Sequence, residues 1–207
     1  MNQQPVKVLL IGFGNPGRLD DRLGPALAEQ VERLGLPGVA VESDYQLCLE
    51  DAEAVARHDV VIFADADTSG AEPFSFRRIE PARSLSFSTH SLRPEAVLDL
   101  ARQLFGARTE GYILGIRGYA FNEYGESLTA RARANLSAAA AFIERICRQG
   151  GFPQFAADVE KGVGVEKGVG SLLPERPDGC FAQKTPAPFF PRQDSFSGEA
   201  VVAASGT

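Results

Sequence analysis

The chain has 207 residues and a mass of 22.2 kDa, a length that suits one domain, with or without a tail. Hydrophobic residues make up 44% of it and charged residues 23%, which is ordinary for a globular protein and excludes global disorder. The 21 Lys and Arg against 27 Asp and Glu give a formal net charge of −6, which argues against a general binder of nucleic-acid phosphates.

No apolar run approaches the roughly 18–20 residues that a membrane span needs, and the first apolar run lacks the cleavage site of a signal peptide. The three cysteines are scattered, without a CxxC pair, which favours reduced thiols and a cytoplasmic location over a disulfide framework. With two histidines and no cysteine cluster, a closed structural zinc site is not expected.

Apolar runs of strand length alternate with helical patterns over the first 150 residues. Strands are predicted over residues 6–11, 39–41, 60–64, 74–79 and 112–116, and helices over residues 23–34, 50–57, 94–105 and 127–148. Because most of the strands are apolar throughout, they suit a parallel sheet covered on both faces. The order of the elements predicts an α/β fold, a three-layer, twisted, mostly parallel sheet with helices on both faces. The alternating run at 74–79 is predicted to be an edge strand.

Some helix ends carry recognisable signals. Pro94 suits the first position of its helix, and Gly106 suits the residue just past its end. Ser127 is predicted to be the N-cap of the longest helix.

The composition changes at Gly150 and Gly151. The sequence beyond them contains VEKGVG twice in tandem, at 159–164 and 165–170, and is otherwise rich in Pro, Gly and Ser. We predict a folded domain over residues 1–150 and a low-complexity, disordered tail over residues 151–207.

The loop after the first strand reads GFGNPGRLDDRLG, residues 12–24. Its glycines satisfy the G-x-G-x-x-G pattern of dinucleotide-binding loops. However, Asp20 and Asp21 stand at the start of the following helix, where two carboxylates would repel a phosphate. The loop therefore suits a cation better, and helix capping is the structural alternative for this acid pair.

Other polar side chains are expected at the same edge of the sheet. Asp65 and Asp67 follow the strand at 60–64, at the edge where open α/β sheets bind ligands, although a turn is the alternative for Asp67. His90 lies in a polar loop before the helix at 94–105, whereas His58 suits a helix end. Together Asp21, Asp65 and His90 offer two carboxylates and an imidazole, a set that suits nickel or zinc and leaves a coordination position open.

Other hydrolytic chemistry finds little support in the chain. With two histidines there is no HExxH motif, and there is no GxSxG elbow. Cys48 stands in a segment typical of strand-to-helix packing, so a thiol nucleophile is not favoured.

In these motifs the chain resembles the maturation endopeptidases of nickel–iron hydrogenases. The resemblance spans about residues 5–149 and rests on G-x-G-N-x(4)-D-D/E-x-x-G after the first strand, an acid after the second, D-A at the end of the third, and T-H before a helix. The matching residues are Gly12, Gly14, Asn15, Asp20, Asp21, Gly24, Asp44, Asp65, Ala66, Asp67, Thr89 and His90.

The resemblance implies an aspartic-type endopeptidase that removes the C-terminal extension of the hydrogenase large-subunit precursor after nickel insertion, and so activates the hydrogenase. It implies Asp21, Asp65 and His90 as catalytic residues and nickel ligands, the nickel being that of the precursor, with no organic cofactor. Asp44 is expected to be a further catalytic acid, and Asp44 or Asp20 the general base. The implied protein is a cytoplasmic monomer that binds the precursor and no nucleic acid.

The chain also departs from this pattern. Many members have Gly-Gly after the acid of the second strand, where this chain has Tyr45 and Gln46. Residues 151–207 have no counterpart in the pattern.

Two alternative functions stay open. Peptidyl-tRNA hydrolases begin with a similar G-x-G-N-P-G loop, but this chain has no histidine before His58 and its negative charge does not suit a tRNA binder. A non-catalytic sensor or chaperone of the nickel state in hydrogenase assembly would need the same ligands as the protease, so turnover would separate these two.

Overall fold

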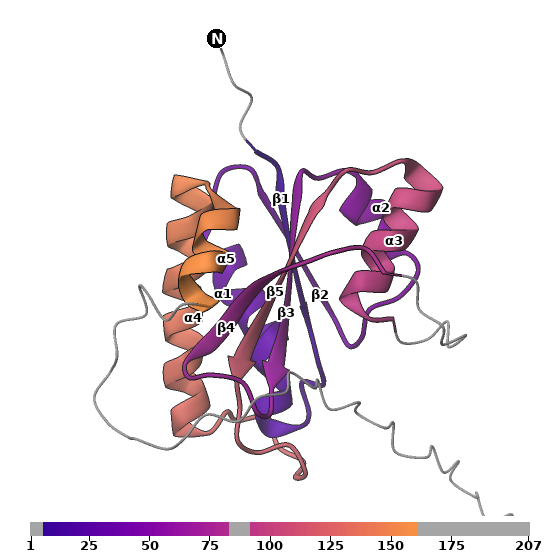
Figure 1. The fold of residues 1–207 in the computed structure, drawn as a ribbon. Coiled ribbons are helices and arrows are strands. Elements are labelled where there is room, and N and C mark those ends of the chain that lie inside the picture. Colours follow the sequence, from indigo (N-terminus) through magenta and orange to yellow (C-terminus); the bar gives the residue numbers. More distant parts are fainter. Residues whose placement is uncertain (1–5, 83–91, 161–207) are drawn as a thin grey trace, which may run out of the picture. The chain divides into compact units, whose positions relative to one another are not determined.

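The computed structural model describes residues 6–82 and 92–160, with side chains up to residue 157 (Figure 1). All of these residues belong to the first of two compact units, Met1–Arg176 and Pro177–Thr207. Among the described residues, no helix combines the length and the apolar character of a membrane span.

A five-stranded sheet forms the middle layer, in the order β2-β1-β3-β5-β4 (Figure 1). The strands are β1 (Val8–Phe13), β2 (Val39–Asp44), β3 (Val60–Asp67), β4 (Phe74–Ile79) and β5 (Glu110–Arg117). All neighbouring pairs are parallel except β4 and β5, which are antiparallel at one edge. The predicted mostly parallel sheet and its edge strand are confirmed.

Helices cover both faces of this sheet. They are the short 3-10 helix η1 (Leu19–Arg22) and the α-helices α1 (Leu23–Leu34), α2 (Asp51–Ala56), α3 (Pro94–Phe105), α4 (Ala130–Gln149) and α5 (Phe152–Glu160). Alternate residues of β1 point to opposite faces: Leu10 lies in the apolar cluster under α1, α4 and α5, and Leu9 in the cluster under α2 and α3. The three-layer α/β fold predicted from the sequence is therefore confirmed.

The end signals of α3 are confirmed, whereas the predicted cap of α4 is wrong. Helix α3 begins with Pro94 and ends at Gly106, which has a left-handed φ of 66°. The N-cap of α4 is Thr129 and not Ser127: the hydroxyl oxygen of Thr129 accepts a hydrogen bond from the amide of Ala132 at 3.2 Å. Thr129 is fixed there because Asp20 binds both its backbone amide and its hydroxyl.

The folded part of the chain continues beyond Gly150, so the tail predicted from residue 151 begins too early. Phe152 and Ala156, four residues apart on α5, are each 4% exposed and belong to the core. The ring of Phe152 lies 5.9 Å from that of Tyr112. A helix of nine residues between two glycines and a low-complexity segment is too short for a periodic signal. The remainder of the predicted tail, 161–207, lies outside the described residues.

Candidate functional site

The loop between β1 and α1 lies at the carboxyl edge of the parallel strands and carries the predicted acid pair. Its glycines allow backbones to approach closely. Gly14 has a φ of 143°, and a Cβ on it would overlap the carbonyl oxygen of Asp21. A Cβ on Gly24 would overlap the carbonyl oxygens of Phe13 and Ala64. The glycine spacing therefore seats η1 against β3, which it contacts, and needs no dinucleotide to explain it.

Asp20 is fully buried and has a structural role. Its Oδ2 accepts hydrogen bonds from the backbone amides of Tyr119 (2.9 Å) and Ala120 (3.1 Å) and from the Thr129 hydroxyl (2.8 Å). Its Oδ1 accepts one from the Thr129 amide at 2.8 Å. A carboxylate closed off from solvent and bound by four donors is not placed to receive a proton from water, so the hypothesis of Asp20 as general base is wrong.

Asp21 is 6% exposed and is held by its own loop. The amide of Asn15 donates to its Oδ2 at 3.2 Å, and the amide of Asp21 donates to the carbonyl of Arg18 at 2.8 Å. The side chain of Asn15 closes the same loop, because its Oδ1 accepts a hydrogen bond from the amide of Gly17 at 2.9 Å. The pattern G-N-x(4)-D-D thus fixes the position of the second acid.

Asp65 and Asp67 lie within β3, which is three residues longer than predicted because β5 pairs with it as far as Arg117. Asp65 is partly buried, and its Oδ1 accepts a hydrogen bond from the amide of Ala66 at 2.7 Å. Asp67 accepts from the amides of Ser69 (2.9 Å) and Gly70 (2.8 Å). The side chain of Asp67 thus forms the predicted turn contacts with Ser69 and Gly70 although its backbone belongs to β3, and Asp65 is the acid of β3 assigned to the predicted site.

The structure describes one of the two histidines, His58. His90 lies outside the described residues, so the predicted set of Asp21, Asp65 and His90 stays a prediction. His58 lies at the end of α2, with Nδ1 2.8 Å from the carbonyl oxygen of Ala54, as expected for a helix-end residue.

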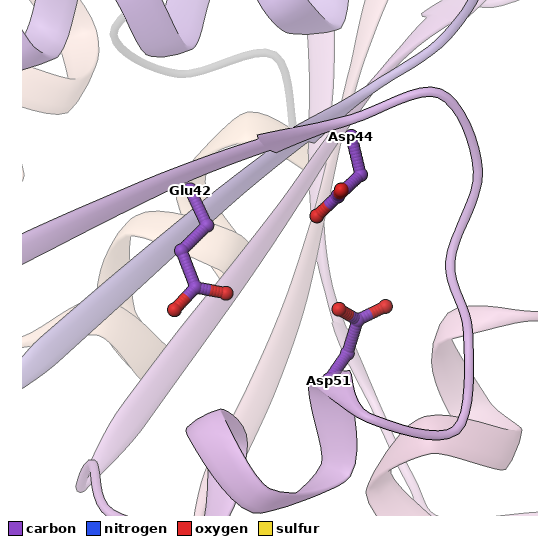
Figure 2. A group of neighbouring side chains, drawn as sticks. All are labelled: Glu42, Asp44 and Asp51. Atoms are coloured by element: carbon purple, nitrogen blue, oxygen red, sulfur yellow. The ribbon is translucent and has the colours of Figure 1, made fainter.

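Asp44 is exposed at the end of β2 and belongs to a group of acids whose proximity was not predicted from the sequence. Figure 2 shows its carboxylate beside those of Glu42 and Asp51. One oxygen from each of the three lies within 4.8 Å of the others. Glu42 and Asp44 are two residues apart on one strand, a spacing that places them on the same face. Asp51 comes from the start of α2, where its Oδ2 accepts a hydrogen bond from the Cys48 amide at 2.7 Å. In the described part of the chain, no other such group of three potential ligands was found.

Burial and the repulsion between the carboxylates both raise pKa values in this group of acids. Burial raises the pKa of Glu42, and the charges of Asp51 and Asp44 raise it further. Burial also raises the pKa of Asp51, against the lowering effect of the Cys48 amide, and Asp44 adds to the rise. The folded state therefore binds protons more readily at these two carboxyls than the unfolded chain does.

An Asp44→Asn variant is expected to be more stable than the wild type at neutral pH. An acid whose pKa is raised on folding stabilises the fold fully below its ordinary pKa, near 4, and this contribution is lost as the pH rises through the raised value. Removing the Asp44 charge reduces that loss, by about 0.3–1 kcal/mol for charges this exposed. Urea unfolding at pH 3, 5 and 7 measures it: the gain should grow with pH, whereas Asp59→Asn, at an exposed acid outside the group, should show no such trend.

Comparison with known proteins identifies the fold. No family model matches the chain, and no curated protein matches it significantly. Among solved structures, the [NiFe] hydrogenase maturation protease HycI from Thermococcus kodakarensis is similar at 22% identity and a TM-score of 0.55, over 69% of this chain and 93% of that one. The hydrogenase maturating endopeptidase HybD from E. coli is similar at 21% identity and a TM-score of 0.51, over 70% and 94%. The chain has the fold of these proteins.

Proposed function

We propose that this chain is a hydrogenase maturation endopeptidase, which removes the C-terminal extension of a [NiFe] hydrogenase large-subunit precursor after nickel insertion. The observation that carries the proposal is the placement of Asp21. The loop between β1 and α1 holds this acid at the carboxyl edge of the sheet. The acid lies in η1, which contacts β3, the strand that carries Asp65. The fold shared with HycI and HybD supports the same activity.

The nickel in this proposal belongs to the precursor. Asp21, Asp65 and His90 would bind it, since carboxylate oxygens and an imidazole nitrogen are donors that Ni²⁺ accepts. Nickel bound there would supply positive charge that polarises the carbonyl group of the scissile peptide bond. A precursor without nickel would lack these contacts, so the three side chains would also select the loaded substrate.

The remaining steps fall to side chains of this protein. The amide of Asn15 keeps the carboxylate of Asp21 in place by donating to its Oδ2. Asp44, exposed at the end of the neighbouring strand β2, is our candidate general base. It would take a proton from the water that attacks the peptide carbonyl, and the C–N bond would then break as the leaving amine gains a proton. This is hydrolysis of the aspartic type, performed in the cytoplasm by a monomer with no organic cofactor.

A cleavage assay read by intact mass tests the activity. The purified protein is mixed with nickel-loaded precursor and, separately, with nickel-free precursor. Loss of a C-terminal peptide from the loaded form alone is the expected result. Tight binding to the loaded form without any change in mass would refute the protease and favour the nickel-state sensor. Equal cleavage of both forms would refute the selection by nickel.

The His90→Ala variant is expected to keep its fold and to lose processing by at least about a hundredfold, the loss typical when a group of the catalytic set is removed. The matched control is His58→Ala, because His58 lies at a helix end outside the proposed site. The rate of precursor cleavage and the circular dichroism spectrum are measured for both. Normal cleavage by His90→Ala would refute its assignment as a ligand.

A further inference from the structure

Two exposed tyrosines project from loops at the carboxyl edge of the sheet. Tyr45 follows β2 and is 61% exposed, and Tyr124 follows β5 and is 84% exposed. In the strand order β2-β1-β3-β5, these loops lie on opposite sides of the loop that follows β1. Tyrosine rings left in water offer large apolar surfaces with a polar tip, and they are enriched where proteins bind each other.

Tyr45 is joined to the beginning of the loop that carries Asp21. The Nδ2 of Asn15 donates a hydrogen bond to the Tyr45 hydroxyl at 2.7 Å. The backbone amide of the same asparagine donates to Asp21. One residue thus fixes both the tyrosine and the proposed ligand.

Tyr124 is joined to the middle of the same loop. Its neighbour Gly125 forms an isolated bridge with Arg18: the amide of Gly125 donates to Gly17 at 2.9 Å, and the amide of Leu19 donates to Gly125 at 2.8 Å. The guanidinium carbon of Arg18 lies 5.9 Å from the centre of the Tyr124 ring. The carbonyl of Arg18 accepts a hydrogen bond from the amide of Asp21, so the segment that carries Tyr124 is bonded to the loop that positions Asp21.

We propose that Tyr45 and Tyr124 bind the polypeptide of the protein substrate on the two sides of Asp21. The inference rests on the proposed function and adds to it the surface on which the substrate docks. Because the loops that hold these rings lie on opposite sides of the loop of Asp21, a polypeptide bound over that loop would lie between the two rings. Its apolar side chains offer surface against which the tyrosine rings can pack.

The described surface contains hollows that the two tyrosines do not line. A hollow of about 410 Å³ lies between α1 and β2, lined by residues that include Pro25, Ala28 and Val41. Another of about 340 Å³ lies beside Leu36 and Cys147. Neither is lined by Asp21, Asp65 or the two tyrosines. The exposure of both tyrosine rings leaves them accessible to a protein partner.

Steady-state cleavage of nickel-loaded precursor by Tyr45→Ala, Tyr124→Ala and the double variant tests the docking surface. Each single change is expected to raise KM about tenfold, as the loss of an interface anchor does, with kcat within about twofold of the wild type. The control is Phe105→Ala. Phe105 is 52% exposed at the end of α3, which leads into β5 and so lies at the opposite edge of the sheet. Tyr45→Phe and Tyr124→Phe keep the rings and should keep the wild-type KM.

The outcomes separate this inference from the proposed function. A KM that stays at the Phe105→Ala value in both tyrosine variants would overturn the docking surface while leaving the protease intact. A fall in kcat without a rise in KM would overturn it as well, because the rings would then act on the loop instead of the substrate. Binding of the loaded precursor is measured in parallel by surface plasmon resonance. A wild type that binds through these tyrosines without cutting would refute the protease and keep the docking surface. A wild type that does neither would overturn both.

Discussion

A chain truncated after Gly150 is expected to be much less stable than one truncated after Glu160. The shorter chain lacks α5, whose Phe152 is 4% exposed and contacts Tyr112, while Phe155 lies 6.1 Å from Phe142, ring centre to ring centre. Losing one buried phenylalanine side chain costs about 3–5 kcal/mol. At about 2–4 °C per kcal/mol for a domain of this size, the melting temperature should fall by roughly 6–20 °C.

Differential scanning calorimetry of the two truncated chains and the full chain measures this effect. The chain that ends at Glu160 should melt like the full chain, since it keeps every helix and strand found in the described residues. Point variants separate the loss of the Phe152 contact from the loss of the whole C-terminal segment. Phe152→Ala should reproduce most of the fall in melting temperature, and Gln154→Ala, at an exposed position of the same helix, should not. Equal melting temperatures for the two truncated chains would show that α5 does not stabilise the domain.

The Asp20→Ala variant is expected to lose about 3–4 kcal/mol of the free energy of unfolding, because buried donors left without an acceptor cost about 1–3 kcal/mol each and entering water satisfies some of them. The donors are three backbone amides and the Thr129 hydroxyl. The variant should also cleave precursor poorly, because the turn that carries Asp21 loses the four side-chain hydrogen bonds that Asp20 makes to the segment after β5.

Urea unfolding at pH 7 measures the change, provided that the slope with denaturant stays the same in variant and wild type. Asp59→Ala is the matched control. Asp59 is an exposed aspartate whose Oδ2 accepts one hydrogen bond, from the amide of Lys7 at 2.9 Å, and its loss should cost less than about 1 kcal/mol. If Asp20→Ala were no more costly than this control, the buried contacts of Asp20 would not hold the two loops together.

Local patterns in the sequence are sufficient to predict most of the fold. The helices over 23–34 and 94–105 have the bounds predicted for them, because amphipathic spacing and an end signal coincide there. The C-terminal end of β3 was missed because aspartates are typical of turns, whereas pairing with β5 keeps Asp65 and Asp67 extended. Thr129 was missed as a cap because its partner, Asp20, is 109 residues away.

The candidate site, like the fold, could be predicted from the sequence only in part. The acid pair and Asp65 could be assigned to the carboxyl edge from the order of strands and loops alone. What the sequence could not separate was the role of each member of the pair, because Asp20 and Asp21 differ in their partners and not in their local pattern. The neighbours of Asp44 were also missed, since Asp51 reaches it only through the turn between β2 and α2.

The long separation between Asp20 and its partners has a consequence for the order in which the protein is made. The turn that carries Asp21 leaves the ribosome early, but Thr129 follows Asp20 by 109 residues. At about 5–20 residues per second, that interval lasts roughly 5–20 s of synthesis. Throughout it, the Asp20 carboxylate has only water and transient neighbours as partners. The turn that carries Asp21 therefore reaches its final geometry only after β5 and the start of α4 have been translated. Before then, the nascent chain cannot hold a metal at this edge of the sheet in the finished arrangement.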